Sequence, residues 1–309
     1  MLASLDPVTQ VPISFCVAFA GVPAPANAVV RVGTRCLGGS PTEELFEPVV
    51  PVGLTHGVQL FRCGRWLLGH AHEPFVAREL AARTESLYRR VLDAARDQHL
   101  YRIWNYVPEI NADSGGLENY RAFCQGRSLA FERTLGGDFQ SWLPAASAVG
   151  CNADRIELIF AAGELAPAHF ENPEQIPAYH YPSEHGPRAP SFARATVATD
   201  GKRTWTFISG TSAIKGHETI APGALDAQLE CTLDNLRLIA KKAGLGDDVG
   251  AQGERRRYFK VYLRHATAFA AARARLEQSL LRPNDTVTYL QADICRAALQ
   301  VEIEATIVG

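Results

Sequence analysis

The order of predicted elements repeats in the two halves of this 309-residue chain. Amphipathic stretches with a helical period alternate with apolar and aromatic stretches of strand length in the same order in each half: helix, aromatic strand, helix, strand, strand. In the first half these segments are 73–98, 101–110, 117–135, 144–150 and 154–162. In the second half they are 224–244, 258–265, 266–281, 286–294 and 299–307. Further strands are predicted at 11–21, 28–36, 45–50 and 57–63, with another ending at 207–210.

This repeated order predicts a distant internal duplication. Because sheets and helices each bury one face, we expect an α+β protein of two halves, each a mixed sheet with helices packed on one face. The halves are placed at residues 1–165 and 166–309, with the break near 163–172. A binding pocket is expected at their junction.

Composition excludes several classes of function. The chain is 47% hydrophobic and carries a net charge of -2, which is ordinary for a soluble protein and gives no reason to expect a nucleic acid or a membrane as partner. The beginning of the sequence lacks the basic region of a signal peptide. Seven scattered cysteines without a CxxC motif, and histidines without ligand spacing, predict reduced thiols, no metal and no cofactor in a cytoplasmic protein.

The segment 179–194 (YHYPSEHGPRAPSFAR) concentrates prolines with large polar side chains. Its three prolines argue against a helix or a central strand, and they stiffen the backbone. One interpretation is a proline-rich linker. The other is a preorganised wall that binds anions through Arg188 and Arg194, because a stiff segment loses little entropy in holding them.

Parts of the second half resemble the RidA/YjgF family. The resemblance rests on SGT (209–211), AQLECTLDNLRLIAKKAGLG (227–246), KVYLRH (260–265) and VEIEA (301–305). It implies YjgF-like (chorismate-mutase-like) halves, with Glu302 in a cleft. The deaminating members carry a carboxylate-binding arginine where this chain has Val287, which disfavours imine hydrolysis.

Residues 100–309 are similar to a narrower family, the chorismatases, which include 3-hydroxybenzoate synthases. The motifs are WNYVPEIN (104–111), ENYRAFCQGRS (118–128), YPSEHGPRAPSFARAT (181–196), ISGTSAIKGHE (208–218) and the terminal VEIEA. The resemblance implies conversion of chorismate to 3-hydroxybenzoate and pyruvate without a cofactor.

The resemblance also implies the site residues. Tyr120, Arg127, Tyr181 and Arg194 would bind the substrate, and Glu302 would act as a general acid that protonates the enolpyruvyl methylene, which requires a pKa raised by burial. Tyr120 and Arg127 lie seven residues apart and therefore share one helix face.

From the residues alone, blander roles stay open for each of these positions. Tyr120 would be a core aromatic, Arg127 a solvated arginine, and Arg194 a partner of an acid such as Glu184. Alternation along the last strand puts Glu302 and Glu304 on one face, which could equally be the solvent face.

Cys295 and Gly216 bear on the product. Both match the chorismatases that form 3-hydroxybenzoate, whereas members that only hydrolyse the enol ether carry Ala at these places. Cys295 would sit near the leaving hydroxyl, and Gly216 would leave room for the ring; by itself Cys295 fits a small buried hydrophobe. The alternatives are a mixed 3-/4-hydroxybenzoate synthase, a hydrolase, or a YjgF-like protein that only binds small carboxylic acids.

Two points stay undecided from the sequence. His180, His185 and His217 could shuttle protons or make structural hydrogen bonds. The chain could be a monomer or a homotrimer.

Overall fold

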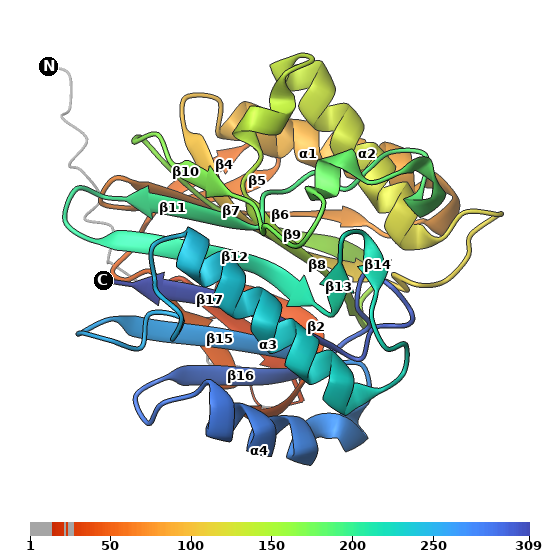
Figure 1. Ribbon diagram of the computed structural model, residues 1–309. Coiled ribbons are helices and arrows are strands. Elements are labelled where there is room, and N and C mark those ends of the chain that lie inside the picture. Colours follow the sequence, from red (N-terminus) through yellow and green to blue (C-terminus); the bar gives the residue numbers. More distant parts are fainter. Residues whose placement is uncertain (1–13, 22, 24–27) are drawn as a thin grey trace, which may run out of the picture.

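The computed structural model describes residues 14–21, 23 and 28–309, and within them two large β-sheets lie between two layers of helices (Figure 1). The six-stranded sheet has the order β4-β5-β6-β9-β7-β8. Its strands are β4 (Val50–Thr55), β5 (Val58–Cys63), β6 (Trp66–Pro74), β7 (His99–Pro108), β8 (Ala145–Cys151) and β9 (Arg155–Gly163).

The nine-stranded sheet has the order β10-β11-β12-β17-β15-β16-β2-β1-β3. Its strands are β1 (Cys16–Ala20), β2 (Val30–Gly39), β3 (Thr42–Glu44), β10 (Ala168–Phe170), β11 (Ala195–Thr199), β12 (Thr204–Ser212), β15 (Arg256–Leu263), β16 (Thr286–Gln291) and β17 (Val301–Val308). A short hairpin, β13 (Ile214–Lys215) with β14 (Glu218–Thr219), stands apart from both sheets.

The two sheets share one topology. The order β4-β5-β6-β9-β7-β8 corresponds strand by strand to β10-β11-β12-β17-β15-β16. The central pairings agree in direction, since β7 is parallel to β8 and antiparallel to β9, just as β15 is parallel to β16 and antiparallel to β17. The duplicated order predicted from the sequence, and the α+β class with it, are therefore confirmed.

The N-terminal strands depart from a simple division of the chain near residue 165. That position falls between β9 and β10, which belong to different sheets. However, β1, β2 and β3 extend the nine-stranded sheet, because β2 pairs with the edge of β16. The pairing covers an edge that β16 would otherwise leave open, so the second sheet uses strands from both ends of the chain.

Each sheet is covered on its outer face by two helices, as predicted (Figure 1). Helices α1 (Leu80–Ala94) and α2 (Asn119–Leu135) pack on the six-stranded sheet, and α3 (Leu225–Lys242) and α4 (Phe269–Ser279) pack on the nine-stranded sheet. In α1 the buried side chains Leu80, Leu87 and Val91 recur at helical spacing, which gives the helix one apolar face.

The inner faces of the sheets meet in an aromatic core that contains Trp66, Trp104, Trp205 and Phe207. Strand β8 lies beside β12, and the amide of Ala145 in β8 donates to the Thr196 hydroxyl of β11 at 2.8 Å. The amide of Ala146 donates to the Ser209 hydroxyl at 2.9 Å, and this hydroxyl donates to the carbonyl of Ala193 at 2.6 Å. These bonds fix the junction at which the functional site forms.

Two predicted elements are wrong in detail. Residues 45–50 are predicted as one strand, but residues 45–49 connect β3 to β4 and only Val50 belongs to a strand, because Pro48 cannot donate to a sheet and Phe46 is buried by stacking on Trp205 at 4.8 Å. The predicted helix 73–98 begins late, because Glu73 and Pro74 still pair with β9 and only a 3₁₀ turn (Ala77–Glu79) precedes α1. Residues 11–13 of the first predicted strand lie outside the described residues. No helix among the described residues is long and apolar enough to cross a membrane.

Candidate active site

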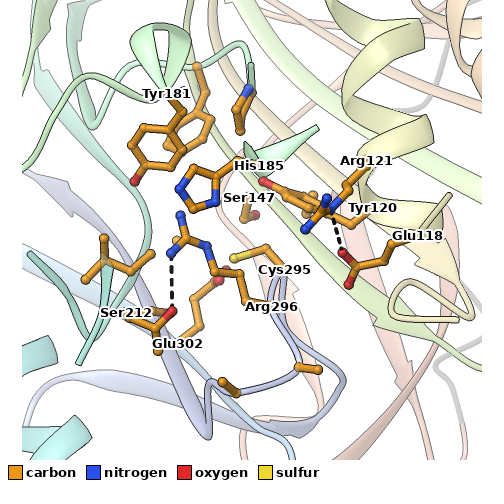
Figure 2. A pocket seen from close by; sticks show the side chains of 18 of the residues that line it. Glu118, Tyr120, Arg121, Ser147, Tyr181, His185, Ser212, Cys295, Arg296 and Glu302 are labelled. Carbon is orange, nitrogen blue, oxygen red and sulfur yellow. Dashed lines mark hydrogen bonds and ion pairs between the residues drawn. The ribbon is translucent and has the colours of Figure 1, made fainter. Parts of the chain in front are cut away.

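A cavity of about 460 Å³ lies at the junction of the two halves. Its lining includes Tyr120 and Arg127 from α2, residues 146–148 of β8, Gly210 and Ser212 from β12, and Glu302 from β17. The proline-rich segment adds Tyr181, His185 and Arg194. The pocket expected at the junction is therefore present, and Figure 2 shows side chains from both halves around it.

Glu302 carries its carboxyl group into this cavity although the residue is only 3% exposed. Among the described residues no hydrogen-bond partner reaches its Oε1. Burial, together with the nearby charge of Glu304, raises the pKa of Glu302 from 4.5 to about 8. The group is therefore a neutral carboxylic acid near pH 7, which is the form that can donate a proton.

Glu304 lies on the same face of β17 but in the opposite electrostatic state. Its carboxylate accepts bonds from Lys260 at 2.8 Å, Arg102 at 2.6 Å and the Trp104 indole at 2.8 Å. Burial pushes the pKa of Glu304 upward, but the charges of Lys260 and Arg102 outweigh this effect and hold the pKa below 4.5. Of the two glutamates, Glu304 is thus ionised and Glu302 is protonated. Two carboxyl groups whose surroundings push their pKa values apart can serve different roles, here a structural anion and an acid catalyst.

Gly210 makes room for the Glu302 side chain. A Cβ at this position would lie 2.0 Å from Oε1 of Glu302. The ladder between β12 and β17 also shifts register between Ile208 and Thr211, which opens the strand pair at this point. Sequence reasoning used Gly210 only as part of the SGT motif, and its contact with Glu302 is visible only in three dimensions.

Arg127 is an almost fully buried cation that lacks an acidic partner. It is 1% exposed and forms no ion pair with any described residue. Its Nε is unbonded, and its Nη2 reaches the sulfur of Cys124 at 3.9 Å. Its guanidinium lies over the rings of Phe123 and Phe192 at 5.1 and 5.8 Å. Since a buried unpaired charge is costly, the position favours an anionic ligand.

Arg194 is the second buried cation of the cavity, with 6% exposure. It donates to the Tyr181 hydroxyl at 2.8 Å and lies over Phe192 at 5.0 Å. The acid closest to pairing with it is Glu171, 4.0 Å from Nε, rather than the suggested Glu184. Burial raises the pKa of Glu171 to about 7 in spite of Arg194, so the arginine keeps much of its capacity for another carboxylate.

Tyr120 and Arg127 both line the cavity, which agrees with their predicted position on one helix face. Burial raises the pKa of Tyr120 well above 10, so its phenol stays protonated and can donate a hydrogen bond. Neither residue is a solvated surface group. The proline-rich segment forms only short 3₁₀ turns (Ala178–His180 and Ser183–His185), and it supplies a wall of the cavity rather than a linker.

The two residues that bear on the product, Cys295 and Gly216, lie differently with respect to the cavity. Cys295 lines the cavity, and Figure 2 shows it pointing toward the same space as Glu302. Burial and the neighbouring Glu302 raise the pKa of the Cys295 thiol to about 12, so it is a neutral donor and not a thiolate.

Gly216, in contrast, is not among the residues that line the cavity, and the idea that it makes room for the ring stays a prediction. Glycine is suited to this place by a φ of +57° in the turn between β13 and β14, where a Cβ would meet open space.

Arg296 is a cavity residue that sequence reasoning missed. Its Nη1 donates to the carbonyl of His217 at 2.7 Å and to the Thr219 hydroxyl at 3.2 Å, and its guanidinium lies 5.3 Å from the centre of the Tyr181 ring. It follows Cys295 directly in the sequence, and this position was the available signal. The cavity lining thus includes Arg296 and Arg121 besides Arg127 and Arg194.

Comparison with known proteins bears on this arrangement. A family profile described as Chorismatase FkbO/Hyg5-like, N-terminal, matches residues 47–162. A chorismatase of Streptomyces rapamycinicus is 36% identical over 272 residues, which cover 82% of this chain and 78% of the relative. The chain belongs to the chorismatase family.

Further relatives agree with this membership. A 3-hydroxybenzoate synthase of Streptomyces hygroscopicus is 38% identical over 217 residues, which are 67% of this chain and 63% of that protein. A crystal structure of a chorismatase matches with a TM-score of 0.80 and 29% identity, covering 98% of this chain and 95% of that one. The family resemblance and the enzyme class predicted from the sequence are confirmed.

Proposed function

We propose that this chorismatase-family protein converts chorismate to 3-hydroxybenzoate and pyruvate, with Glu302 as the general acid. The observation that carries the proposal is the combination of one buried neutral carboxylic acid with two buried arginines. Arg127 forms no ion pair with any described residue, and the carboxylate of Glu171 lies 4.0 Å from Nε of Arg194. Chorismate complements this cavity, because its two carboxylates can pair with the two arginines and its acid-sensitive enol ether can accept a proton from the neutral acid. The name of the Streptomyces hygroscopicus relative supports 3-hydroxybenzoate as product.

Binding would place the two carboxylates of chorismate against Arg127 and Arg194. A guanidinium is suited to this task because its planar fork bonds both oxygens of a carboxylate. Both arginines lie over the Phe192 ring, which holds their planes in place before the substrate enters. The Tyr181 hydroxyl fixes Arg194, and Tyr120 contributes a neutral phenol. This preorganisation reduces the entropy lost on binding.

The first chemical step is the transfer of the Glu302 proton to the methylene carbon of the enolpyruvyl group. The enol ether then becomes an oxocarbenium ion, which the newly formed Glu302 carboxylate stabilises. Addition of water and collapse of the adduct release pyruvate and leave the ether oxygen on ring carbon three. The neighbouring ring hydroxyl then leaves as water while a ring proton is lost, and the ring becomes aromatic. The water consumed is thus returned, and the two products together hold the atoms of chorismate.

Cys295 acts in the second stage of this sequence. As a neutral thiol at the cavity wall, it can donate a hydrogen bond to the hydroxyl that leaves. Loss of this interaction would allow the dihydrodiol to escape before aromatisation. The role of Cys295 therefore concerns which product forms, whereas Glu302 decides whether pyruvate forms at all.

The test is an incubation of pure protein with chorismate, with pyruvate measured by a coupled assay and the aromatic products separated by chromatography. We expect pyruvate and 3-hydroxybenzoate in equal amounts, and we expect Glu302→Gln to abolish both. If 4-hydroxybenzoate forms as a second product, or if the only product besides pyruvate is a dihydrodiol, Glu302 would remain the general acid and the role of Cys295 would have to be revised. Binding of chorismate without pyruvate would overturn the assignment as an enzyme of this reaction and favour a carboxylate-binding protein.

A further inference from the structure

A cluster of metal-ligating side chains lies at the rim of the cavity, outside the groups assigned to catalysis. It consists of Glu184 and His185, on the second 3₁₀ turn of the proline-rich segment, and His217, in the turn between β13 and β14. His185 also lines the cavity. The two histidines are 32 positions apart in the sequence, so no local ligand motif announces the cluster.

The ligand atoms form a compact triangle. Nε2 of His185 and Nδ1 of His217 are 2.9 Å apart, and Oε1 of Glu184 lies 3.6 Å from the first and 3.5 Å from the second. In a tetrahedral zinc site, bonds of about 2.0–2.1 Å to nitrogen and oxygen put neighbouring ligand atoms about 3.3–3.4 Å apart. The observed separations lie on both sides of this value, so an ion fits after shifts of a few tenths of an ångström.

The two imidazoles already compete for one proton. A hydrogen bond between two ring nitrogens needs one nitrogen that carries a proton and one that offers its lone pair. Metal ligation uses the lone pair of both nitrogens, so an ion would take the place of this shared proton. Both rings are partly shielded, with side-chain exposures of 20% for His185 and 26% for His217. Their facing nitrogens thus resemble a ligand pair more than two independent surface histidines.

The charge around the cluster also permits a cation. Besides Glu184, the carboxylate of Glu218 comes within 3.2 Å of His217 Nδ1 and could turn to supply a fourth ligand, a place that a water molecule could also take. The positive charge of Arg296 opposes metal binding, but the carboxylates of Glu184 and Glu218, 3.5 and 3.2 Å from His217 Nδ1, offset it. The same arginine donates to the backbone carbonyl of His217 and so holds the hairpin in position.

We infer that Glu184, His185 and His217 bind a divalent ion of the Zn²⁺ class, which joins the proline-rich segment to the β13–β14 hairpin at the cavity rim. Two imidazoles and a carboxylate suit this class of ion rather than Mg²⁺ or Ca²⁺, which prefer oxygen ligands throughout. The ion would also fix Tyr181, whose ring lies 5.2 Å from His185 and 6.4 Å from His217. The site is a structural clip beside the substrate pocket, and it stands whether or not the proposed reaction is correct.

The experiment uses the full-length protein after chelator treatment, with Zn²⁺ as the probe. We expect one equivalent of Zn²⁺ to remain bound through gel filtration and to raise the melting temperature by several degrees, because the ion binds only the folded chain. Co²⁺ in place of Zn²⁺ should give the visible absorption of a four-coordinate nitrogen and oxygen site, without the thiolate charge-transfer band that cysteine ligands produce. His185→Ala and His217→Gln should each weaken binding at least tenfold.

The matched control is His180→Ala, because His180 belongs to the same segment but packs on Tyr179 with ring centres 4.7 Å apart. This variant should bind Zn²⁺ as the wild type does. Circular dichroism checks that all variants fold. Absence of retained Zn²⁺ in the wild type would overturn the inference, and so would binding that survives both cluster substitutions, since the ion would then sit on other groups such as the cysteines. None of these readouts depends on chorismate, so failure here and failure of the proposed reaction are distinguishable.

Discussion

Replacing Glu302 by Gln should stabilise the protein in a manner that depends on pH. The folded-state pKa of about 8 exceeds the ordinary value of 4.5, so the group stays protonated in the folded chain while it ionises in the unfolded chain. Stability of the wild type is therefore lost as pH rises from about 4.5 to 8, whereas glutamine does not titrate. At pH 7, roughly 2.5 pH units above the ordinary pKa, the ionisation of Glu302 in the unfolded chain has lowered the free energy of unfolding of the wild type by about 3 kcal/mol, at 1.36 kcal/mol per unit. At pH 5 the same calculation gives a loss of less than about 1 kcal/mol.

The measurement is urea denaturation of both proteins between pH 5 and 7.5, with the difference in free energy of unfolding followed at each pH. Glu304→Gln is the matched control, because this carboxylate is ionised and paired. Its folded-state pKa is depressed, so its stabilisation is present at neutral pH and is lost in acid, and the control should destabilise by about 3–5 kcal/mol at pH 7. If the difference in free energy of unfolding between wild type and Glu302→Gln does not change from pH 5 to 7.5, Glu302 is not a buried neutral acid.

Four further outcomes follow from the same geometry. Because kcat/KM requires protonated Glu302, it should fall above about pH 8 in a pH–rate profile. Gly210→Ala should lower kcat by about 10²–10⁴-fold with the fold retained by circular dichroism, since its Cβ would occupy the place of the Glu302 carboxyl; unchanged kcat would contradict this packing. Arg127→Lys should lower kcat/KM roughly 10–100-fold because a bidentate contact is lost, and an effect below twofold would argue against carboxylate binding there. Cys295→Ala should keep pyruvate release but divert product from 3-hydroxybenzoate to the dihydrodiol, as chromatography would show; an unaltered product would remove Cys295 from the mechanism.

Sequence reasoning succeeded where a single element or a single motif carries the information. The shared face of Tyr120 and Arg127 follows from helical periodicity, and both residues do line the cavity. The repeated order of helices and strands likewise predicted the shared topology of the two sheets. In both cases the relevant spacing lies within one stretch of chain, where local geometry fixes it.

The features that sequence reasoning missed depend on contacts between distant segments. Gly210 matters because Glu302 on another strand needs its space, and Arg296 reaches the cavity through bonds to His217 and Thr219. The position of Gly216 outside the cavity lining was also not visible in the sequence, because a motif match says which residue is present but not which way its loop turns. Burial of the charged network around Glu304 also required both sheets, since Arg102 and Lys260 come from opposite layers.

The pairing of β2 with β16 has a consequence for how the chain is assembled. All strands of the six-stranded sheet come from one continuous stretch between Val50 and Gly163, so this sheet can form as soon as that stretch is synthesised. Strands β1–β3 are synthesised before this stretch and β16 after it, and β2 pairs with β16 where Gly39 lies opposite Thr288. Contacts of such long sequence separation form slowly. These strands therefore leave the ribosome well before they can dock, and until then their unpaired edge needs protection from other chains.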